Sequence, residues 1–345
     1  MKQRNQEITP IPTEWVGPIS ITGNVVNEQV SVPMATYETP LWPSTGRGAR
    51  VSRQAGGVRC TLVDERMTRS VAVRAANGAE AYEAWRSIAA RFDEADAVVQ
   101  TTSRFARLLK MNRQIVGNLL FLRFECSTGD ASGHNMVTGA ADALLGWVLN
   151  EYPQLEYATI SGNFCTDKKP SAVNGLLGRG KYVVAEMEIS RELCTKQLRT
   201  TPEKMAQLNV EKNLIGGIAA GSLRSANAHF ANMLLAFYLA TGQDAANIIE
   251  GSQGIVHAEA RPDSLYFSCT MPNLIVGSVG SGKGNEVVEQ NLVRLGCKED
   301  REPGDNARRL AVLCAATVLC GEISLLAAQT NPGELMRTHF KMERG

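Results

Sequence analysis

The chain has 345 residues, which is enough for about two domains that each bury a hydrophobic core. With 36 Lys and Arg against 35 Asp and Glu, the net charge of +1 excludes the general attraction to nucleic acid or anionic membranes that a basic excess gives. The unusual counts are 31 glycines and only 6% aromatic residues, which indicate many tight turns and a core of aliphatic side chains.

Between residues 70 and 160 the spacing of hydrophobic residues changes several times between that of a strand and that of a helix. The predicted elements are a strand at 71–74, a helix whose apolar face covers 82–92, extended segments at 104–115 and 119–126, a helix at 134–150 and a strand at 155–160. The order β-α-β-β-α-β is typical of a ferredoxin-like unit. Because long stretches flank it, we expect this unit to be inserted into a larger domain.

The remaining chain is richer in helices. Alternation at 183–189 predicts a strand, and 214–239 and 306–329 read as long helices rich in small residues. We therefore predict an α+β fold, with a large mixed, helix-rich domain and the inserted ferredoxin-like domain. The expected boundaries are 1–69 and 171–345 for the large domain, 70–160 for the insertion and 161–170 for a connecting loop.

Three features that the sequence lacks bear on where the protein is located and on the state of its cysteines. The opening residues lack the apolar stretch of a secretory signal. The most apolar segment, 310–329, contains Glu322 and is interpreted as a buried helix, so no membrane span is expected. Eight cysteines are scattered without a C-x-x-C pair, which favours reduced core residues over disulfides or a metal site. We expect a cytoplasmic protein.

A glycine-rich turn follows the apolar run at 274–276. Residues 277–284 read Gly-Ser-Val-Gly-Ser-Gly-Lys-Gly, which fits a phosphate-binding loop of nucleoside triphosphatases except that Gly284 replaces the hydroxyl residue that would hold magnesium. A purely structural alternative is a strand-to-helix turn that needs glycine for its geometry alone. We prefer an intermediate interpretation, in which backbone N–H groups of the turn face a phosphate of another ligand.

Three polar groupings stand out beside this turn. The loop at 161–170 contains Asp167-Lys168-Lys169, which by itself is most simply a solvated charged segment. His229 lies between two asparagines within an apolar helical pattern, where helix capping and packing are the simpler explanation. The segment 243–247 reads as a capped turn that ends this helix.

Taken together, ordered motifs along nearly the whole chain resemble the catalytic domain of 3-hydroxy-3-methylglutaryl-coenzyme A (HMG-CoA) reductases. The matching segments are Val32 to Glu38, Met67 to Arg69, Thr102 to Leu108, Gly129 to Met136, Asp167 to Pro170, Asn209 to Gly217, Gly242 to Ala246, the turn at Gly277, and Leu335 to His339. This family has a large domain for the coenzyme A substrate and an inserted ferredoxin-like domain for the nicotinamide cofactor. Its reaction, in the mevalonate pathway of isoprenoid synthesis, uses two hydride transfers from NAD(P)H to give mevalonate and coenzyme A.

The resemblance implies roles for individual residues. Lys168 would stabilise an oxyanion, Glu38 would donate a proton from a carboxyl whose pKa is raised by burial, Asp244 would tune both, and His339 would protonate the coenzyme A thiolate. The implied substrate-binding residues are Arg69, Ser161, Asp167, Lys169, Lys212, His229 and Asn232. The implied cofactor-binding residues are Ser103, Arg104, Asp130, Ser132, Gly133, His134, Asn135, Gly277, Val279, Gly280, Gly282 and Arg344.

Arginines at 104 and 344 favour the 2′-phosphate of NADPH over NADH, and no metal is expected. The expected partners are HMG-CoA, coenzyme A and further copies of the chain, because the family's active site lies between subunits. The departures are Tyr37 and Thr39 beside Glu38, Ser132 and His134 where Met is usual, and Ser281 with Lys283 in the glycine turn. A phosphate-loop NTPase and a non-catalytic coenzyme A-binding protein stay as alternatives.

Overall fold

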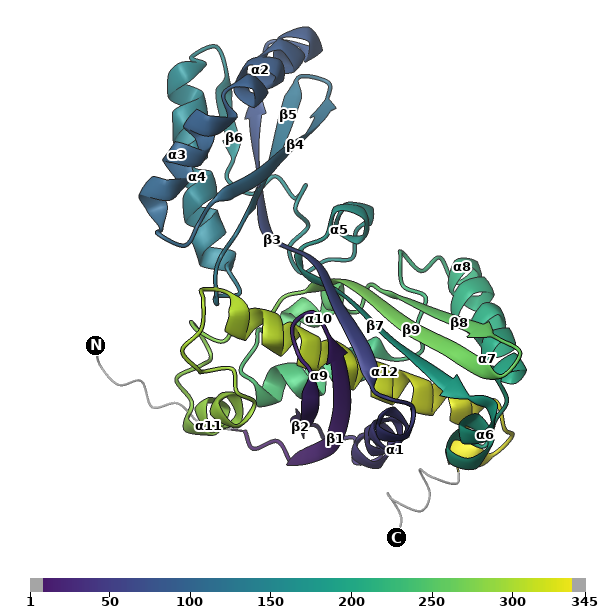
Figure 1. Cartoon of the computed structure of the whole chain (residues 1–345). Coiled ribbons are helices and arrows are strands. Elements are labelled where there is room, and N and C mark those ends of the chain that lie inside the picture. The colour runs from purple at the N-terminus through teal and green to yellow at the C-terminus, as the bar shows by residue number, and fades with distance from the viewer. Residues whose placement is uncertain (1–8, 337–345) are drawn as a thin grey trace.

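A single long strand joins two parts of the molecule. The computed structural model describes residues 9–336, and in it β3 (Val58–Arg74) runs through 17 residues. Its first half belongs to a sheet of order β2-β1-β3-β7-β9-β8, and its second half to a sheet of order β6-β3-β5-β4. Figure 1 shows β3 passing from the larger lower part into the smaller upper part. The predicted strand at 71–74 is the end of this longer element.

The larger part packs its sheet around one central helix, α12 (Asp305–Gln329). Its other elements are β1 (Thr13–Gly23), β2 (Glu28–Ala35), α1 (Leu41–Gln54), α5 (Ala172–Leu177), β7 (Gly180–Ser190), α6 (Arg191–Leu193), α7 (Pro202–Leu208), α8 (Gly217–Ala219), α9 (Phe230–Ala240), α10 (Ile248–Gly251), β8 (Ile255–Ala260), β9 (Ser264–Leu274) and α11 (Glu286–Arg294). Along β7 the residues Val183, Ala185, Met187 and Ile189 are buried, which confirms the predicted alternation.

The smaller part has a hydrophobic core of its own between its sheet and three helices. Its remaining elements are α2 (Gly78–Ala90), α3 (Phe92–Thr102), β4 (Leu108–Val116), β5 (Leu119–Cys126), α4 (His134–Glu151) and β6 (Glu156–Thr159). Where one helix was expected up to residue 92, the structure has two that meet at Arg91, and residues 103–107 lie outside β4. The expected boundary at residue 70 falls inside β3, so a continuous strand, without a linker, crosses it.

The prediction of one helix over 214–239 was wrong. A π-helical segment (Asn209–Gly216) and α8 are followed by a loop, and α9 begins only at Phe230. Within the loop Gly221 and Arg224 have positive φ values of 74° and 51°, which a helix cannot contain. The side chain of Asn227 accepts a hydrogen bond from the N–H of Phe230, so the apolar pattern of 230–240 starts at a capped helix end.

The buried-helix interpretation of 310–329 is confirmed. In the part of the chain that the structure describes, α12 is the one helix with the length and composition to cross a membrane, but 94% of its most apolar window is buried inside the protein. All eight cysteines are buried and unpaired, as the sequence indicated.

Close packing of α1 on α12 gives a first prediction. A Cβ atom added at Gly48 would collide with the backbone of Cys320 in α12, whereas one added at Gly46 would meet only Val16 Cγ1 at 3.9 Å. We expect Gly48→Ala to lower the free energy of unfolding by roughly 1–3 kcal/mol through overpacking. Gly46→Ala, the matched control on the same helix, should raise it by about 0.5–1 kcal/mol. Urea denaturation of both variants measures this, and equal effects would contradict the described helix contact.

Candidate active site

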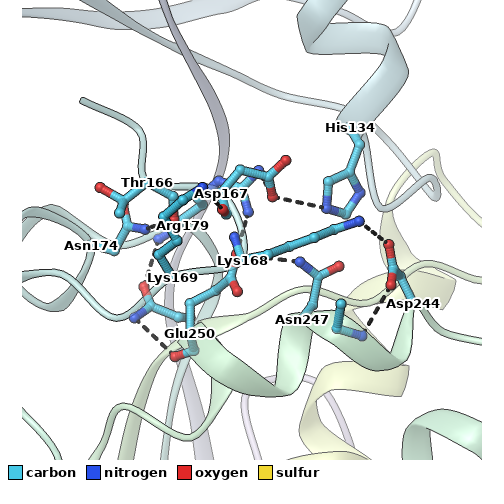
Figure 2. A network of polar contacts seen from close by, with 12 residues as sticks. His134, Thr166, Asp167, Lys168, Lys169, Asn174, Arg179, Asp244, Asn247 and Glu250 are labelled. Atoms are coloured by element: carbon cyan, nitrogen blue, oxygen red, sulfur yellow. Dashed lines mark hydrogen bonds and ion pairs between the residues drawn. The ribbon is translucent and has the colours of Figure 1, made fainter. Parts of the chain in front are cut away.

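Lys168 and Asp244 form an ion pair in which Nζ lies 2.7 Å from Oδ2. Their side chains are 40% and 43% exposed, so the pair is open to a ligand (Figure 2). The hydrogen bond that Lys168 donates to Asp244 raises the pKa of Lys168 above its ordinary value. Partial burial acts to raise the pKa of Asp244, but the bonds from Lys168 and the N–H of Ala246 outweigh it and hold that pKa below its usual range. Both groups are therefore charged near neutral pH.

The loop that carries Lys168 is held by buried charges. Asp167 Oδ1 lies 2.9 Å from Nη2 of Arg179, a residue with no exposed surface, and Oδ2 lies 3.8 Å from Arg69. Arg69 also donates hydrogen bonds to Thr138 of α4. The simple interpretation of 161–170 as a freely solvated charged segment is therefore wrong at Asp167, because tertiary ion pairs fix it.

His134, the first residue of α4, lies over this loop. Its Nε2 is 3.8 Å from Asp167 Oδ1, and its Nδ1 is 3.4 Å from the hydroxyl of Ser132. Burial, the largest cause, and the charge of Arg179 together lower the pKa of His134 to about 4 against the opposing charge of Asp167. The imidazole is therefore neutral at physiological pH. Figure 2 shows its ring beside the Asp167 carboxylate, to the right of it in this view.

Glu38 belongs to a second polar group at the start of α9. Its Oε2 accepts a hydrogen bond of 2.8 Å from Asn232, one turn into the helix. His229, just before the helix, bonds through Nδ1 to Glu322 of α12 at 2.8 Å, and Glu322 also accepts from the N–H groups of Ala228 and His229. Glu38 is exposed, so the burial that its expected proton-donor role requires is absent from the single chain.

The two polar groups lie at opposite ends of α9. Asn232 is in its first turn, Asp244 lies four residues beyond its last residue, Ala240, and the part of the helix between them spans about 12 Å. No hydrogen bond or ion pair joins Glu38 to Lys168 among the residues that the structure describes. The structure thus brings Lys168 to Asp244, and Glu38 to Asn232, but leaves the two pairs apart.

A cavity of about 130 Å³ opens beside Glu38 and His229. Its wall includes Ser44 and Arg47 of α1, neither of which sequence reasoning singled out. Arg47 lies 3.3 Å from Glu334 and bonds to Ser324 through Nε at 2.9 Å. The signal that could have found it is a basic residue in the segment directly after Glu38, which the structure shows to be helix α1.

The glycine turn after β9 is fixed to the loop of Asp244. Gln243 donates to the carbonyl of Gly277 at 3.1 Å and accepts from its N–H at 2.9 Å. A Cβ on Gly282 would collide with the carbonyl of Gly242, so the two backbones touch. Lys283 is buried and donates to that same carbonyl, and burial lowers its pKa to about 8. A lysine bound in this way does not face a phosphate, so the NTPase interpretation is not favoured.

A second turn packs against the first. Ala131 pairs with Val279 as a β-bridge, and the N–H of Ser278 donates to the carbonyl of Asp130 at 2.8 Å. The carboxylate of Asp130 accepts from the N–H groups of Gly304 and Ala307. Its carboxylate therefore caps α12, and its carbonyl joins the two turns.

A cavity of about 770 Å³ begins at Gly129 and Asp130. Four arginines line it, namely Arg104, Arg107, Arg301 and Arg308. The acidic residues in its wall, Asp130 and Glu65, are engaged by the start of α12 and by Arg308 at 2.5 Å. Arg104 lies over the ring of Phe105 at 4.6 Å. Arg301 pairs with Glu299, and Arg308 with Glu65 and Asp305, so Arg104 and Arg107 are the cations that suit an anionic ligand here.

The remaining predicted site residues are distributed as follows. Ser161 lies 3.5 Å from Arg69, and Lys169 is exposed. Lys212 lies in the π-helical segment, with its Nζ 3.5 Å from Oδ1 of Asn213. Ser103 directly follows α3, and Gly133 and Asn135 lie at the start of α4. Gly280 has a positive φ of 98°. His339 and Arg344 lie outside the described residues. No cluster of metal-ligating side chains is present between residues 9 and 336.

The fold is similar to that of solved reductase structures. It superposes on the class II 3-hydroxy-3-methylglutaryl-CoA reductase from Streptococcus pneumoniae, a structure bound to NADPH, with a TM-score of 0.75 over 96% of this chain and 88% of that chain. The two sequences are 19% identical, so this likeness concerns the fold alone.

The hydroxymethylglutaryl-coenzyme A reductase family model matches residues 8–344. The reductase of Pyrococcus horikoshii is 43% identical over 324 residues, which cover 93% of this chain and 78% of that one. The reductase of Nicotiana sylvestris is 43% identical over 340 residues, 97% of this chain and 56% of its relative. The chain belongs to the hydroxymethylglutaryl-coenzyme A reductase family, a family of oxidoreductases, which confirms the resemblance found in the sequence.

The neutral His134 gives a second prediction. Because its pKa of about 4 in the folded chain lies below the ordinary 6.5, the unfolded chain takes up the proton first as the pH falls. Between pH 7 and pH 5 this group should cost roughly 2 kcal/mol of stability. We expect His134→Gln to lose less stability than the parent over this range in urea titrations. The same substitution at exposed His257 is the control, and parallel curves for parent and His134→Gln would contradict the buried neutral state.

Proposed function

We propose that this protein reduces HMG-CoA to mevalonate and free coenzyme A with two equivalents of NAD(P)H. In the balanced reaction the thioester carbon receives two hydrides, the carbon–sulfur bond breaks, and two protons are taken up. One proton goes to the new hydroxyl group and the other to the departing thiolate. The nicotinamide cofactor supplies the hydrides, and every other requirement falls on side chains of the protein.

The observation that carries the proposal is the Lys168–Asp244 pair. An ammonium fixed at 2.7 Å from a carboxylate, and still partly exposed, can stabilise the negative charge that develops on a carbonyl oxygen when a hydride reaches its carbon. Asp244 keeps the lysine protonated and limits its motion. Asp167 and Lys169 adjoin Lys168 in the crossover loop, and Arg69 of β3 lies 3.8 Å from Asp167 and 3.5 Å from Ser161 of the same loop. We assign them to the carboxylate and hydroxyl of the hydroxymethylglutaryl group.

The cavity with four arginines fits an anionic dinucleotide. Arg104 and Arg107 would hold phosphate there, and the backbone around Gly129 and Gly277 lets a cofactor approach closely. A guanidinium on this cavity is the basis for proposing NADPH over NADH. The order β6-β3-β5-β4 and the separate core support a ferredoxin-like cofactor domain near residues 70–160.

We further propose that two copies of the chain build each active site. Glu38 is exposed and bonds to Asn232 at the start of α9, whereas Lys168 bonds to Asp244 beyond the end of that helix, so we assign the lysine to one subunit and the glutamate to the other. The partner would then provide the burial that a proton-donating carboxyl needs. An apolar surface supports this assembly: Leu176 is 69% and Ile218 is 78% exposed, with Ile215 and Leu223 also exposed on adjacent segments.

The reaction itself is the third prediction. Purified protein given HMG-CoA should consume two reduced cofactors per thiol released, faster with NADPH than with NADH, as read from nicotinamide absorbance and a thiol reagent. Lys168→Met should lower kcat roughly 100- to 1,000-fold, because a positioned oxyanion donor is lost.

The matched control is Lys196→Met, which removes a lysine exposed on the surface and paired with Glu192. It should leave kcat unchanged. Failure of HMG-CoA to oxidise either cofactor would refute the proposed function. Full activity of Lys168→Met would refute the role of the lysine, and binding of coenzyme A without turnover would favour the non-catalytic alternative.

A fourth prediction concerns the shared site. Glu38→Gln and Lys168→Met should each be inactive alone, yet mixing and reassociating the two should restore about a quarter of the parent activity. The fraction follows because half of randomly formed dimers are mixed, and each has one intact site of two. Activity of the mixture no higher than that of the separate variants would place both residues in one chain's site.

A further inference from the structure

Lys168 has a backbone conformation that its own residue type does not favour. Its φ is 56°, in the left-handed region where residues other than glycine are uncommon. Thr166, two residues earlier, also has a positive φ of 44°. Such conformations persist only where the surroundings impose them. The contacts of the Lys168 backbone therefore decide where its ammonium lies.

Glu250 makes the contact that fixes this backbone. Its Oε1 accepts a hydrogen bond of 2.9 Å from the N–H of Lys168. The same oxygen accepts from Nη1 of Arg179 at 2.7 Å and from Asn247 at 3.3 Å. Glu250 is fully buried in α10, so it does not compete for substrate. Figure 2 shows it beneath the lysine loop, on the side away from His134.

Arg179 joins the two carboxylates on either side of the loop. It is fully buried, with Nη1 on Glu250 and Nη2 at 2.9 Å from Asp167. Its backbone N–H donates to Oδ1 of Asn273 in β9 at 2.9 Å, so the backbone of Arg179 is anchored to the large sheet. One buried cation thus holds the residue before Lys168 and the acceptor of the Lys168 N–H together.

Two residues of the segment 244–250 bind Lys168, one at its side-chain ammonium and one at its backbone N–H. Asp244 holds the ammonium, and Glu250, six residues later, holds the backbone N–H. Nothing in the established family membership assigns a role to Arg179 or Glu250, and neither was found from the sequence. We propose that the buried Arg179–Glu250 pair is a positioning device that aims the Lys168 ammonium at the reacting carbonyl. This inference rests on the proposed function for its kinetic consequence, but not for its structural one.

The test is a graded series at Glu250. Glu250→Ala removes the acceptor, whereas Glu250→Gln keeps an oxygen for the N–H of Lys168 while losing the charge. We expect kcat to fall roughly 10- to 100-fold in the Ala variant and less in the Gln variant, with KM for HMG-CoA within about threefold, because a displaced ammonium weakens the transition state more than substrate binding. Hydrogen exchange at the Lys168 amide should accelerate in the same order.

The matched control is Glu125→Gln, which removes the charge of another fully buried carboxylate, the partner of Arg123 and Arg66. Glu125 bonds to no residue of the Lys168 loop, so it should lower thermal stability without changing kcat or Lys168 exchange. If Glu250→Ala does not fold, the Gln variant decides by the same readouts.

Loss of turnover no greater than in Glu125→Gln, or unchanged exchange at Lys168, would overturn the positioning role. If the parent protein has no reductase activity, the proposed function fails, while the exchange data still decide whether Glu250 holds Lys168.

Discussion

The burial of Arg179 is the constraint on which the site depends. A guanidinium without solvent contact costs several kcal/mol unless carboxylates meet it, and here Asp167 and Glu250 do so from opposite sides. To satisfy it, the crossover loop must close over the large sheet and α10 must lie beneath that loop. The partly exposed Lys168–Asp244 pair therefore adjoins a buried network, and its geometry depends on the buried charges of Arg179 and Glu250.

Close backbone contacts connect this network to the other side of the site. Gln243 pairs with the backbone of Gly277, and Gly242 touches Gly282, so the loop that presents Asp244 and the glycine turn form one assembly. The second turn, at Asp130 to Ser132, packs on the first and is tied to the start of α12. On the proposed function, the groups that meet the substrate and those that meet the cofactor are thus fixed to the same core helix.

The single chain buries its hydrophobic cores, but within residues 9–336 its two groups of candidate catalytic residues do not bond to each other. The two polar groups at the ends of α9 each have ordered hydrogen bonds, yet a helix length separates them. The proposed assembly of two subunits accounts for the exposure of Glu38 and of the apolar residues around Ile218 in the single chain. A proton donor that is buried only on assembly would restrict the chemistry to the assembled enzyme.

The sequence by itself determined the family, the strand at 183–189, the buried helix at 306–329, the reduced cysteines and the residue types at Lys168, Asp244 and Glu38. These follow from local periodicity and from ordered motifs, which short stretches of chain carry. The tertiary structure decided where the helix pattern of 214–239 breaks, that Asp130 caps α12, that Lys283 is buried, and that Arg179 and Glu250 lie under Lys168. Lys168 and Glu250 are 82 residues apart, and a hydrogen bond over that separation depends on how whole elements pack, which no local pattern contains.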